Sequence, residues 1–228
     1  MDARSREPGR WETLMARDGH EFAAYLAGTH GRPRGAVVIL QEIYGVNEHI
    51  RAVVDQYAAA GYLCIAPALF DRIGRNIELG YGPEQREQGR GYVLQLERSQ
   101  VIRDLSAACA VVRHAGRLAL VGFGWGGQLA WLGAGELGVD ASVAYYGTRI
   151  WEFLNPLPKC PMMLHFGTAD PLIPAANVER IRAAFPQGIY HLYPAGHGFS
   201  GVGRPGYDER SAAQAWQYTQ EFLAQYIG

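Results

Sequence analysis

Residues Leu118–Gln128 have the layout of a turn that presents a catalytic nucleophile in many enzymes. The pattern predicts a buried strand, a tight turn and a helix start, and in G-x-Nu-x-G an exposed Ser or Cys occupies the centre of that turn. The chemistry would be attack of this side chain on a carbonyl carbon. Here the central residue is Gly124, which has no side chain, so any nucleophile must come from elsewhere.

Two polar residues further along the chain could form an acid–base pair. Asp170 follows an apolar segment and precedes Pro171, so a purely structural role in a turn is the alternative to a chemical one. His197 lies between two glycines after another predicted strand, which favours an exposed side chain that is free to turn. In such a pair the histidine takes up a proton, while the aspartate fixes its tautomer and stabilises the imidazolium. The order of turn, Asp and His along the chain is that of the α/β-hydrolases.

The same chemistry needs N–H groups that hold the negative charge developing on the carbonyl oxygen. We expect one such donor at Trp125, directly after the central glycine, and the other at Ile43, in the loop after the first buried strand. In open parallel sheets, sites form where the strands end at their carboxyl edge. This places four segments on one rim: 41–45, 122–127, 167–171 and 195–199.

The elements that would position these residues alternate between strands and helices. This alternation predicts a mostly parallel central sheet with helices on both faces, and we expect a single α/β-hydrolase domain over residues 1–228. Residues 71–91 are expected to form an irregular excursion. The strands are predicted at 11–15, 21–27, 35–41, 63–67, 118–123, 141–146, 161–167 and 190–193, and the helices at 47–60, 99–115, 127–137, 175–185 and 211–226.

Composition excludes several classes of protein. A net charge of −1 gives no reason to expect binding to nucleic acid or to an anionic membrane. No apolar run reaches the roughly 18 residues of a membrane span. The N-terminus lacks the apolar region of a secretory signal, and the three cysteines read as buried free thiols, so we expect a cytoplasmic protein. The histidines and cysteines lack metal-ligand spacing, so neither a metal nor a cofactor is expected. The partner would be a small molecule, and the chain a monomer or homodimer.

The chain resembles the dienelactone hydrolases (carboxymethylenebutenolidases). The similarity extends over nearly the whole chain and is carried by five motifs: Gln41–Asn47, Gly122–Gly127, Ala144–Gly147, His165–Asp170 and Tyr193–Phe199. The resemblance implies a cysteine hydrolase of enol-lactones with a Cys–His–Asp triad. By position, Asp170 and His197 would be two of its members, and Glu42 would be the glutamate that interacts with the resting nucleophile. Ile43 and Trp125 match the oxyanion donors of the family.

Two features depart from the family pattern. Gly124 replaces the nucleophilic cysteine, and none of the three cysteines has an obvious way to substitute for it: Cys64, Cys109 and Cys160. The arginine that binds the substrate carboxylate in the family is also hard to place. The candidates, each of which could equally be ordinary surface charge, are Arg75, Arg86, Arg90 and Arg204.

Several hypotheses fit these residues. In the first, His197, oriented by Asp170 and assisted by Glu42, acts as general base on water or on a substrate proton, in hydrolysis or in a rearrangement. The space beside Gly124 would hold about one water molecule, roughly 30 Å³. In the second, the chain binds a lactone-like or aromatic ligand without turnover. Its pocket would be lined by Arg86 and by aromatic residues that could equally be core: Tyr44, Tyr145, Tyr146 and Trp151.

Two further interpretations concern Gly124 itself. An engineered replacement in an active cysteine hydrolase would also place a glycine there. Alternatively, Gly122, Gly124 and Gly127 satisfy the dinucleotide-binding pattern G-x-G-x-x-G. That pattern should open the first βαβ unit and be followed by an acidic residue at the end of the next strand. Here it lies in the middle of the chain, and the next strand ends in Tyr145-Tyr146-Gly147 without an acid.

Overall fold

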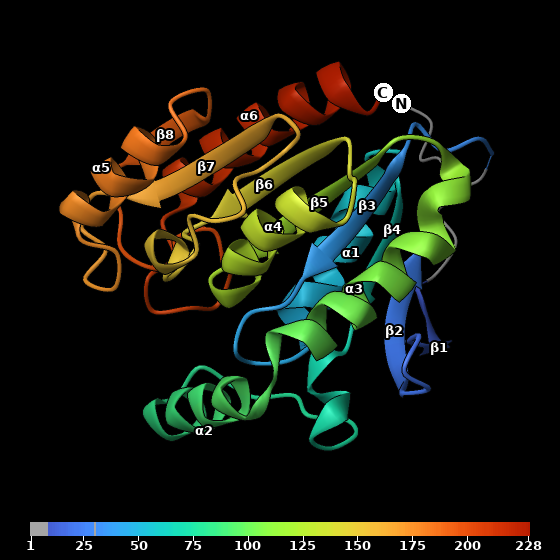
Figure 1. Ribbon diagram of the computed structural model, residues 1–228. Helices are drawn as coiled ribbons and strands as arrows, with labels where there is room; N and C mark the ends of the chain where they lie inside the picture. The colour runs from blue at the N-terminus through green and yellow to red at the C-terminus, as the bar shows by residue number, and fades with distance from the viewer. Residues whose placement is uncertain (1–8, 30) are drawn as a thin grey trace. The chain divides into compact units, whose positions relative to one another are not determined.

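The computed structural model describes residues 9–29 and 31–228 of the chain. It divides into two compact units, the first reaching Leu118 and including Ile227, the second running from Ala119 to Tyr226 and including Gly228. Each unit has its own strands and helices (Figure 1). The single-domain organisation therefore stays a prediction, and the prediction about a secretory signal concerns residues 1–8, which lie outside the described part of the chain.

The strands of the first unit follow the order β1-β2-β4-β3. β1 pairs antiparallel with β2, β2 pairs antiparallel with β4, and β3 runs parallel to β4. Every residue of β3 is buried, as its continuous apolar run predicts, whereas β2 buries Phe22, Ala24 and Leu26 on one face. The bounds are Arg10–Met15 for β1, Glu21–Ala27 for β2, Ala36–Leu40 for β3 and Leu63–Pro67 for β4.

The predicted helices of the first unit are present. In α1 (Glu48–Ala59) the Asn47 side chain caps the start by accepting from the Ile50 amide at 3.2 Å, and Gly61, with φ of 100°, follows the end. In α3 (Arg98–Val112) the buried residues recur at helical spacing. Two short 3₁₀ helices, η1 and η2, occupy Leu69–Arg72 and Arg113–Ala115.

The prediction of an irregular segment over residues 71–91 is wrong in its second half, where the chain forms α2 (Pro83–Gln95). Pro83 starts this helix, because a proline in the first turn has no amide to satisfy and its φ suits a helix. Gly89 weakens the sequence signal for a helix, but its presence has a tertiary cause. A Cβ at Gly89 would lie 2.0 Å from the carbonyl oxygen of Ile43.

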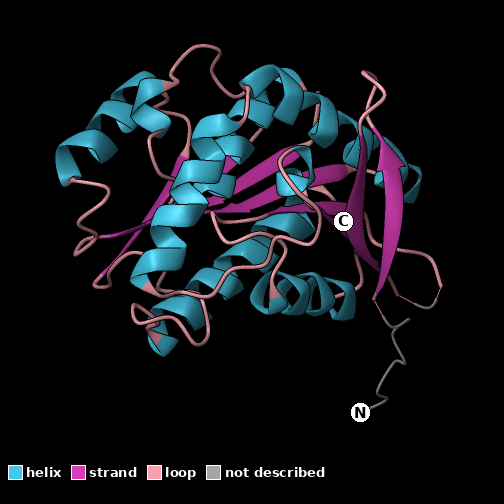
Figure 2. Cartoon of the chain, turned by 90° about the horizontal axis from the view of Figure 1, so that it is seen from below, coloured by secondary structure: helices cyan, strands magenta, loops and turns pink. Residues whose placement is uncertain are grey.

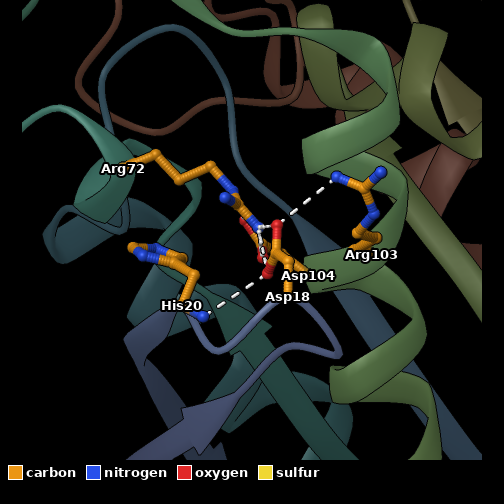
Figure 3. A network of polar contacts seen from close by, with 5 residues as sticks. All are labelled: Asp18, His20, Arg72, Arg103 and Asp104. Atoms are coloured by element: carbon orange, nitrogen blue, oxygen red, sulfur yellow. Dashed lines mark hydrogen bonds and ion pairs between the residues drawn. The ribbon is translucent and has the colours of Figure 1, made fainter.

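A cluster of polar contacts joins three segments of the first unit; Figure 3 shows its members Asp18, His20, Arg72, Arg103 and Asp104, of which His20 takes part through its backbone amide. Arg72 donates Nε and Nη2 to the two carboxylate oxygens of Asp104 at 2.7 and 2.6 Å, and Nη2 also lies 3.0 Å from Asp18 Oδ2. Arg103 Nη1 donates to the same Asp18 oxygen at 3.4 Å. The Asp104 side chain is 0% exposed, and a buried carboxylate is tolerated where an arginine binds both of its oxygens.

The strands of the second unit are all parallel, in the order β5-β6-β7-β8. Their predicted ends differ from the observed ones by at most one residue. The bounds are Leu118–Phe123 for β5, Ala141–Tyr145 for β6, Met162–Gly167 for β7 and Ile189–Tyr193 for β8. The prediction of a mostly parallel arrangement is confirmed, since the antiparallel pairs in the described residues involve only β1, β2 and β4.

Helices cover both faces of the second unit's strands. The Ser142 hydroxyl donates to Ala130 O of α4 at 3.0 Å, and the Tyr145 hydroxyl donates to Ala215 O of α6 at 3.2 Å. Residues 142 and 145 point to opposite faces of β6, because side chains alternate along a strand. Helices therefore lie on both sides of these strands, as predicted, and Figure 2 shows helices on both sides. The helix bounds are Trp125–Glu136 for α4, Ala175–Ala184 for α5 and Glu209–Tyr226 for α6, with η3 at Ile150–Glu152.

The most apolar helix is α4, in which every residue from Trp125 to Gly135 is buried. Its 12 residues would be about 18 Å long, well short of the roughly 30 Å hydrocarbon core of a bilayer. Among the helices formed by the described residues, none combines the length and the apolar character that crossing a membrane requires.

Candidate functional site

The turn between β5 and α4 has the geometry expected of a nucleophile turn. Gly124 has φ of 55° and ψ of −113°, angles that L residues rarely adopt and glycine adopts without strain. Hydrogen bonds hold it from both sides of the backbone. Its N–H donates to Tyr145 O at 3.0 Å, and its carbonyl accepts from Gly127 N at 3.0 Å and from Thr148 N at 3.2 Å. The strand–turn–helix prediction is confirmed, and its central residue presents only backbone.

The glycines on either side of Gly124 are required by close backbone approach. A Cβ at Gly122 would lie 1.9 Å from Gly126 O, and a Cβ at Gly127 would lie 2.7 Å from Gly147 Cα. The strand, the helix start and the loop after β6 therefore pack with no room for side chains. This packing accounts for the glycine pattern without a bound dinucleotide.

Asp170 and His197 meet in the second unit. The ring Nδ1 of His197 lies 2.7 Å from Asp170 Oδ2, with the Asp170 side chain 0% and the His197 side chain 15% exposed. The other oxygen, Oδ1, accepts from the Leu172 amide at 2.8 Å. Asp170 therefore bonds within the turn after β7 and also contacts the imidazole, and its chemical role stays a prediction.

The loops after β7 and β8 bring this pair together. Because β7 and β8 are parallel neighbours, both loops leave from the same edge. The Ala169 amide donates to Ala195 O at 3.1 Å, and a Cβ at Gly167 would lie only 2.3 Å from that oxygen. After His197 the chain turns back at Gly198, whose φ is 77°. A Cβ at Gly206 would lie 2.4 Å from His197 O, so the returning chain packs directly against the histidine backbone.

The two expected oxyanion donors lie in different units. Trp125 is the first residue of α4, at the positive end of the helix dipole, one residue beyond Gly124. Ile43 lies in the loop after β3 of the first unit, and Gly89 of α2 backs its carbonyl. The neighbouring Glu42 is 2% exposed, and its carbonyl accepts from the side chain of Gln41 at 3.3 Å.

The thiols are unsuited to replace the missing nucleophile. All three cysteines are free. Burial raises the pKa of Cys109 to about 12 and that of Cys160 to about 11, and it raises the pKa of the fully buried Cys64 well above its usual range. The thiolate is the nucleophilic form of cysteine, so these side chains are unreactive near neutral pH. Cys160 is half-buried rather than buried as predicted.

The aromatic residues proposed for a pocket have different surroundings. Tyr145 is 2% exposed, and its hydroxyl bonds to α6 at Ala215 O and Thr219 Oγ1, which favours the alternative that it belongs to the core. Tyr146 packs against His197, with ring centroids 5.1 Å apart. In the first unit Tyr44 packs on Tyr81 at 4.8 Å, and in the second Trp151 lies half-buried on η3.

Among the four candidate arginines, Arg204 shares a unit with Asp170 and His197. Its guanidinium lies against the residue that follows His197, since a Cβ at Gly198 would be 2.4 Å from Arg204 Cζ. Arg75 pairs with Asp71 at 3.0 Å, Arg90 pairs with Glu87 at 3.4 Å, and Arg86 is exposed on α2. Sequence reasoning gave no reason to prefer Arg204, because its approach to the His197 loop depends on the chain turning back after Gly201.

No cluster of three or more His, Cys, Asp or Glu side chains suited to a metal ion occurs within residues 9–29 and 31–228. The histidines that do come together, His165 and His191, stack at 5.4 Å. Both ring nitrogens of His165 are engaged, Nδ1 with Tyr193 Oη at 2.8 Å and Nε2 with Thr219 Oγ1 at 3.0 Å. Burial lowers the pKa of His165 well below 6.5, so it is neutral and structural.

Comparison with known proteins gives a consistent result. The model of the dienelactone hydrolase family matches residues 22–227. The chain is 34% identical over 223 residues to the carboxymethylenebutenolidase of Pseudomonas putida, covering 93% of this chain and 94% of that protein. It is 32% identical over 221 residues to carboxymethylenebutenolidase 1 of Cupriavidus pinatubonensis, covering 92% and 94% respectively.

Solved structures agree with this result. A crystal structure from Klebsiella pneumoniae subsp. pneumoniae, of a protein provisionally named a dienelactone hydrolase, has a TM-score of 0.84 at 31% identity, covering 96% of this chain and 100% of that one. A dienelactone hydrolase-like promiscuous phosphotriesterase from metagenomic libraries has a TM-score of 0.74 at 19% identity, covering 97% and 100%, which is a likeness of fold alone. The predicted α/β-hydrolase fold is confirmed.

Proposed function

This chain belongs to the dienelactone hydrolase family, and from that membership we propose that it acts on a small lactone or ester. The proposal extends the substrate class of its relatives to a chain in which Gly124 stands at the nucleophile position. The reaction that we propose differs from that of a cysteine hydrolase because it is non-covalent: water attacks in place of the missing thiol.

His197 is the general base in this route. Asp170 accepts from Nδ1 at 2.7 Å, so Nδ1 carries the proton and Nε2 is the ring atom that takes up another. A water molecule beside Gly124 attacks the carbonyl carbon and gives its proton to Nε2. The amide of Trp125 holds the oxyanion, and the proton then passes from Nε2 to the leaving oxygen as its bond to carbon breaks.

The observation that carries this proposal is the contact between the fully buried carboxylate of Asp170 and the partly exposed imidazole of His197. Both lie in the unit that contains the turn centred on Gly124. The structural bond of Asp170 to the Leu172 amide uses only Oδ1, and the second oxygen is directed at the imidazole. Removal of the nucleophile in well-studied triads leaves a rate roughly 10³–10⁴ above water, so the remaining parts retain catalytic power.

The test compares His197→Ala and Gly124→Cys with the unchanged chain on a panel of lactones and activated esters. Loss of the general base should lower kcat/KM by roughly 10²–10⁴. Gly124→Cys should raise activity and give a burst of acyl-enzyme, because it restores the nucleophile of the family's Cys–His–Asp triad. His114→Ala, which removes an exposed histidine on η2, is the matched control and should have no effect. Turnover that survives His197→Ala would contradict the proposal.

Two outcomes would support other functions. Hydrolysis places solvent oxygen in the product acid, so a reaction in ¹⁸O-labelled water that leaves the product unlabelled indicates a proton-transfer rearrangement by the same base. The second candidate is a binding protein, favoured by the missing nucleophile itself. Calorimetric binding of a lactone with no turnover, together with a gain of activity in Gly124→Cys, would indicate a binding protein or an engineered replacement of an active cysteine.

A further inference from the structure

Tyr146 adopts a backbone conformation that tyrosine seldom takes. It follows β6 directly and has φ of 38°, in the left-handed region where a Cβ meets the backbone. The next residue is Gly147, so glycine is already used in this turn, yet position 146 keeps a large side chain. A residue held in strain needs surroundings that determine its position, and such residues cluster at functional sites.

The side chain of Tyr146 is directed at residues 197–200, which are called the histidine loop below. It is 0% exposed, and its ring meets the His197 imidazole at a centroid distance of 5.1 Å and an interplanar angle of 66°. Its hydroxyl lies 3.0 Å from Ser200 Oγ, and Phe199 packs on the same ring at 5.4 Å. Tyr146 therefore contacts the histidine loop at its first, third and last positions, 197, 199 and 200.

The backbone on either side of Tyr146 is hydrogen-bonded to Gly124, the central residue of the turn between β5 and α4. The preceding residue, Tyr145, accepts from the Gly124 amide at 3.0 Å, and Thr148 donates to the Gly124 carbonyl at 3.2 Å. The Tyr146 amide itself donates to His165 O of β7 at 2.7 Å. Tyr146, which contacts His197, therefore lies between two residues that are hydrogen-bonded to Gly124. It links the general base to the turn where the water would react.

We propose that Tyr146 is a positioning residue for His197, an inference that rests on the proposed function. The hydrogen bond that Nδ1 donates to Asp170 fixes this ring atom but leaves the imidazole able to swing about that contact. The Tyr146 ring removes this freedom, and its hydroxyl holds the loop closed through Ser200. The left-handed backbone is what turns the ring from the strand toward the loop.

The test uses Tyr146→Phe, Ser200→Ala and the double variant, with Tyr146→Leu to remove the ring. Tyr145→Phe is the matched control, because it deletes a buried hydroxyl one residue away that bonds to α6 instead. Two readouts report on the imidazole: the NMR signal of the His197 Nδ1 proton in the protein without substrate, and the pH profile of kcat.

We expect Tyr146→Phe and Ser200→Ala each to lower kcat about 10-fold with KM unchanged, less than the roughly 10²-fold loss caused by a 1 Å misplacement. The Nδ1 proton signal should broaden in both, and the acid limb of the profile should move to lower pH because Asp170 stabilises the imidazolium less well. The double variant should be no worse than either single one, since both remove the same bond. Tyr146→Leu should have the largest effect, and Tyr145→Phe should lower only the melting temperature.

An Nδ1 signal and a pH profile that stay unchanged in Tyr146→Phe, Ser200→Ala and Tyr146→Leu would overturn the inference, as would losses that multiply in the double variant. The proposed function fails by a different result, turnover that survives His197→Ala. The NMR readout needs no substrate, so it decides the positioning role even in that case.

Discussion

Two buried carboxylates in this protein lie at almost the same distance from a basic side chain and yet differ in what they can do. In the first unit Asp104 faces Arg72 at 2.6 Å (Figure 3), and in the second Asp170 faces His197 at 2.7 Å. Both carboxylate side chains are 0% exposed. The difference lies in the partner and in what surrounds it.

Arg72 remains charged at any pH at which proteins fold, and its side chain is 9% exposed between Asp104 and Asp18. It cannot exchange a proton, so the cluster in Figure 3 can only hold the chain together. An imidazole, unlike a guanidinium, can take up and release a proton, and the second ring nitrogen of His197 is not used by Asp170. A short contact to a buried carboxylate therefore indicates chemistry only where the partner can exchange a proton.

The largest expected effect on stability comes from Arg72→Met. This change leaves Asp104 buried without its partner, and such a loss costs about 3–5 kcal/mol of unfolding free energy. Urea denaturation would measure it. The control is Arg90→Met, whose pair with Glu87 is 65% and 66% exposed, where less than about 1 kcal/mol is expected. Equal destabilisation by the two variants would show that the cluster does not hold the first unit together.

The matching change in the second unit, Asp170→Asn, should affect turnover rather than folding. The amide oxygen can still accept from the Leu172 amide, so the turn keeps its bond, but the imidazole loses the charge that selects its tautomer. We expect kcat to fall by roughly 10²–10⁴ while the unfolding free energy changes by less than in Arg72→Met. An Asp170→Asn protein that unfolds easily but turns over normally would reverse the assignment of roles.

The smallest expected effect is the pH dependence of stability that comes from His165. This histidine is buried without a carboxylate partner, and its two ring nitrogens bond to the neutral hydroxyls of Tyr193 and Thr219. Burial lowers its pKa well below 6.5 in the folded chain, so the unfolded chain binds a proton that the folded chain does not. Its contribution is therefore complete above about pH 6.5 and is lost as pH falls below that value, with a slope of at most about 1.4 kcal/mol per pH unit.

Denaturation at pH values from 7.5 down to 5.5 would measure this slope. His165→Gln should flatten it, whereas His114→Ala, at an exposed position, should not. A slope that is the same in all three proteins would place the acid sensitivity elsewhere.

The elements that the sequence predicts well are those with local signals. Apolar runs bounded by turn residues locate β3 and β5, and Asn47 followed by Gly61 at the far end delimits α1. The helix α2 was missed because Gly89 obscured its pattern, and that glycine reflects packing against Ile43 rather than a local preference. Neither the cluster around Arg72 nor the contact of Tyr146 with His197 leaves a local pattern, since their members lie far apart in the chain.

The sequence alone determined that position 124 has no side chain, that an Asp and a His follow it in hydrolase order, and that each comes after its own strand, because these depend only on residue identity and on neighbours in the chain. The tertiary structure alone decided that Asp170 and His197, 27 residues apart, meet at 2.7 Å, and that the Tyr146 ring packs on the imidazole while its hydroxyl bonds to Ser200. Such contacts depend on the parallel register of β7 and β8 and on the paths of the loops that leave them, which arise only when the strands pair.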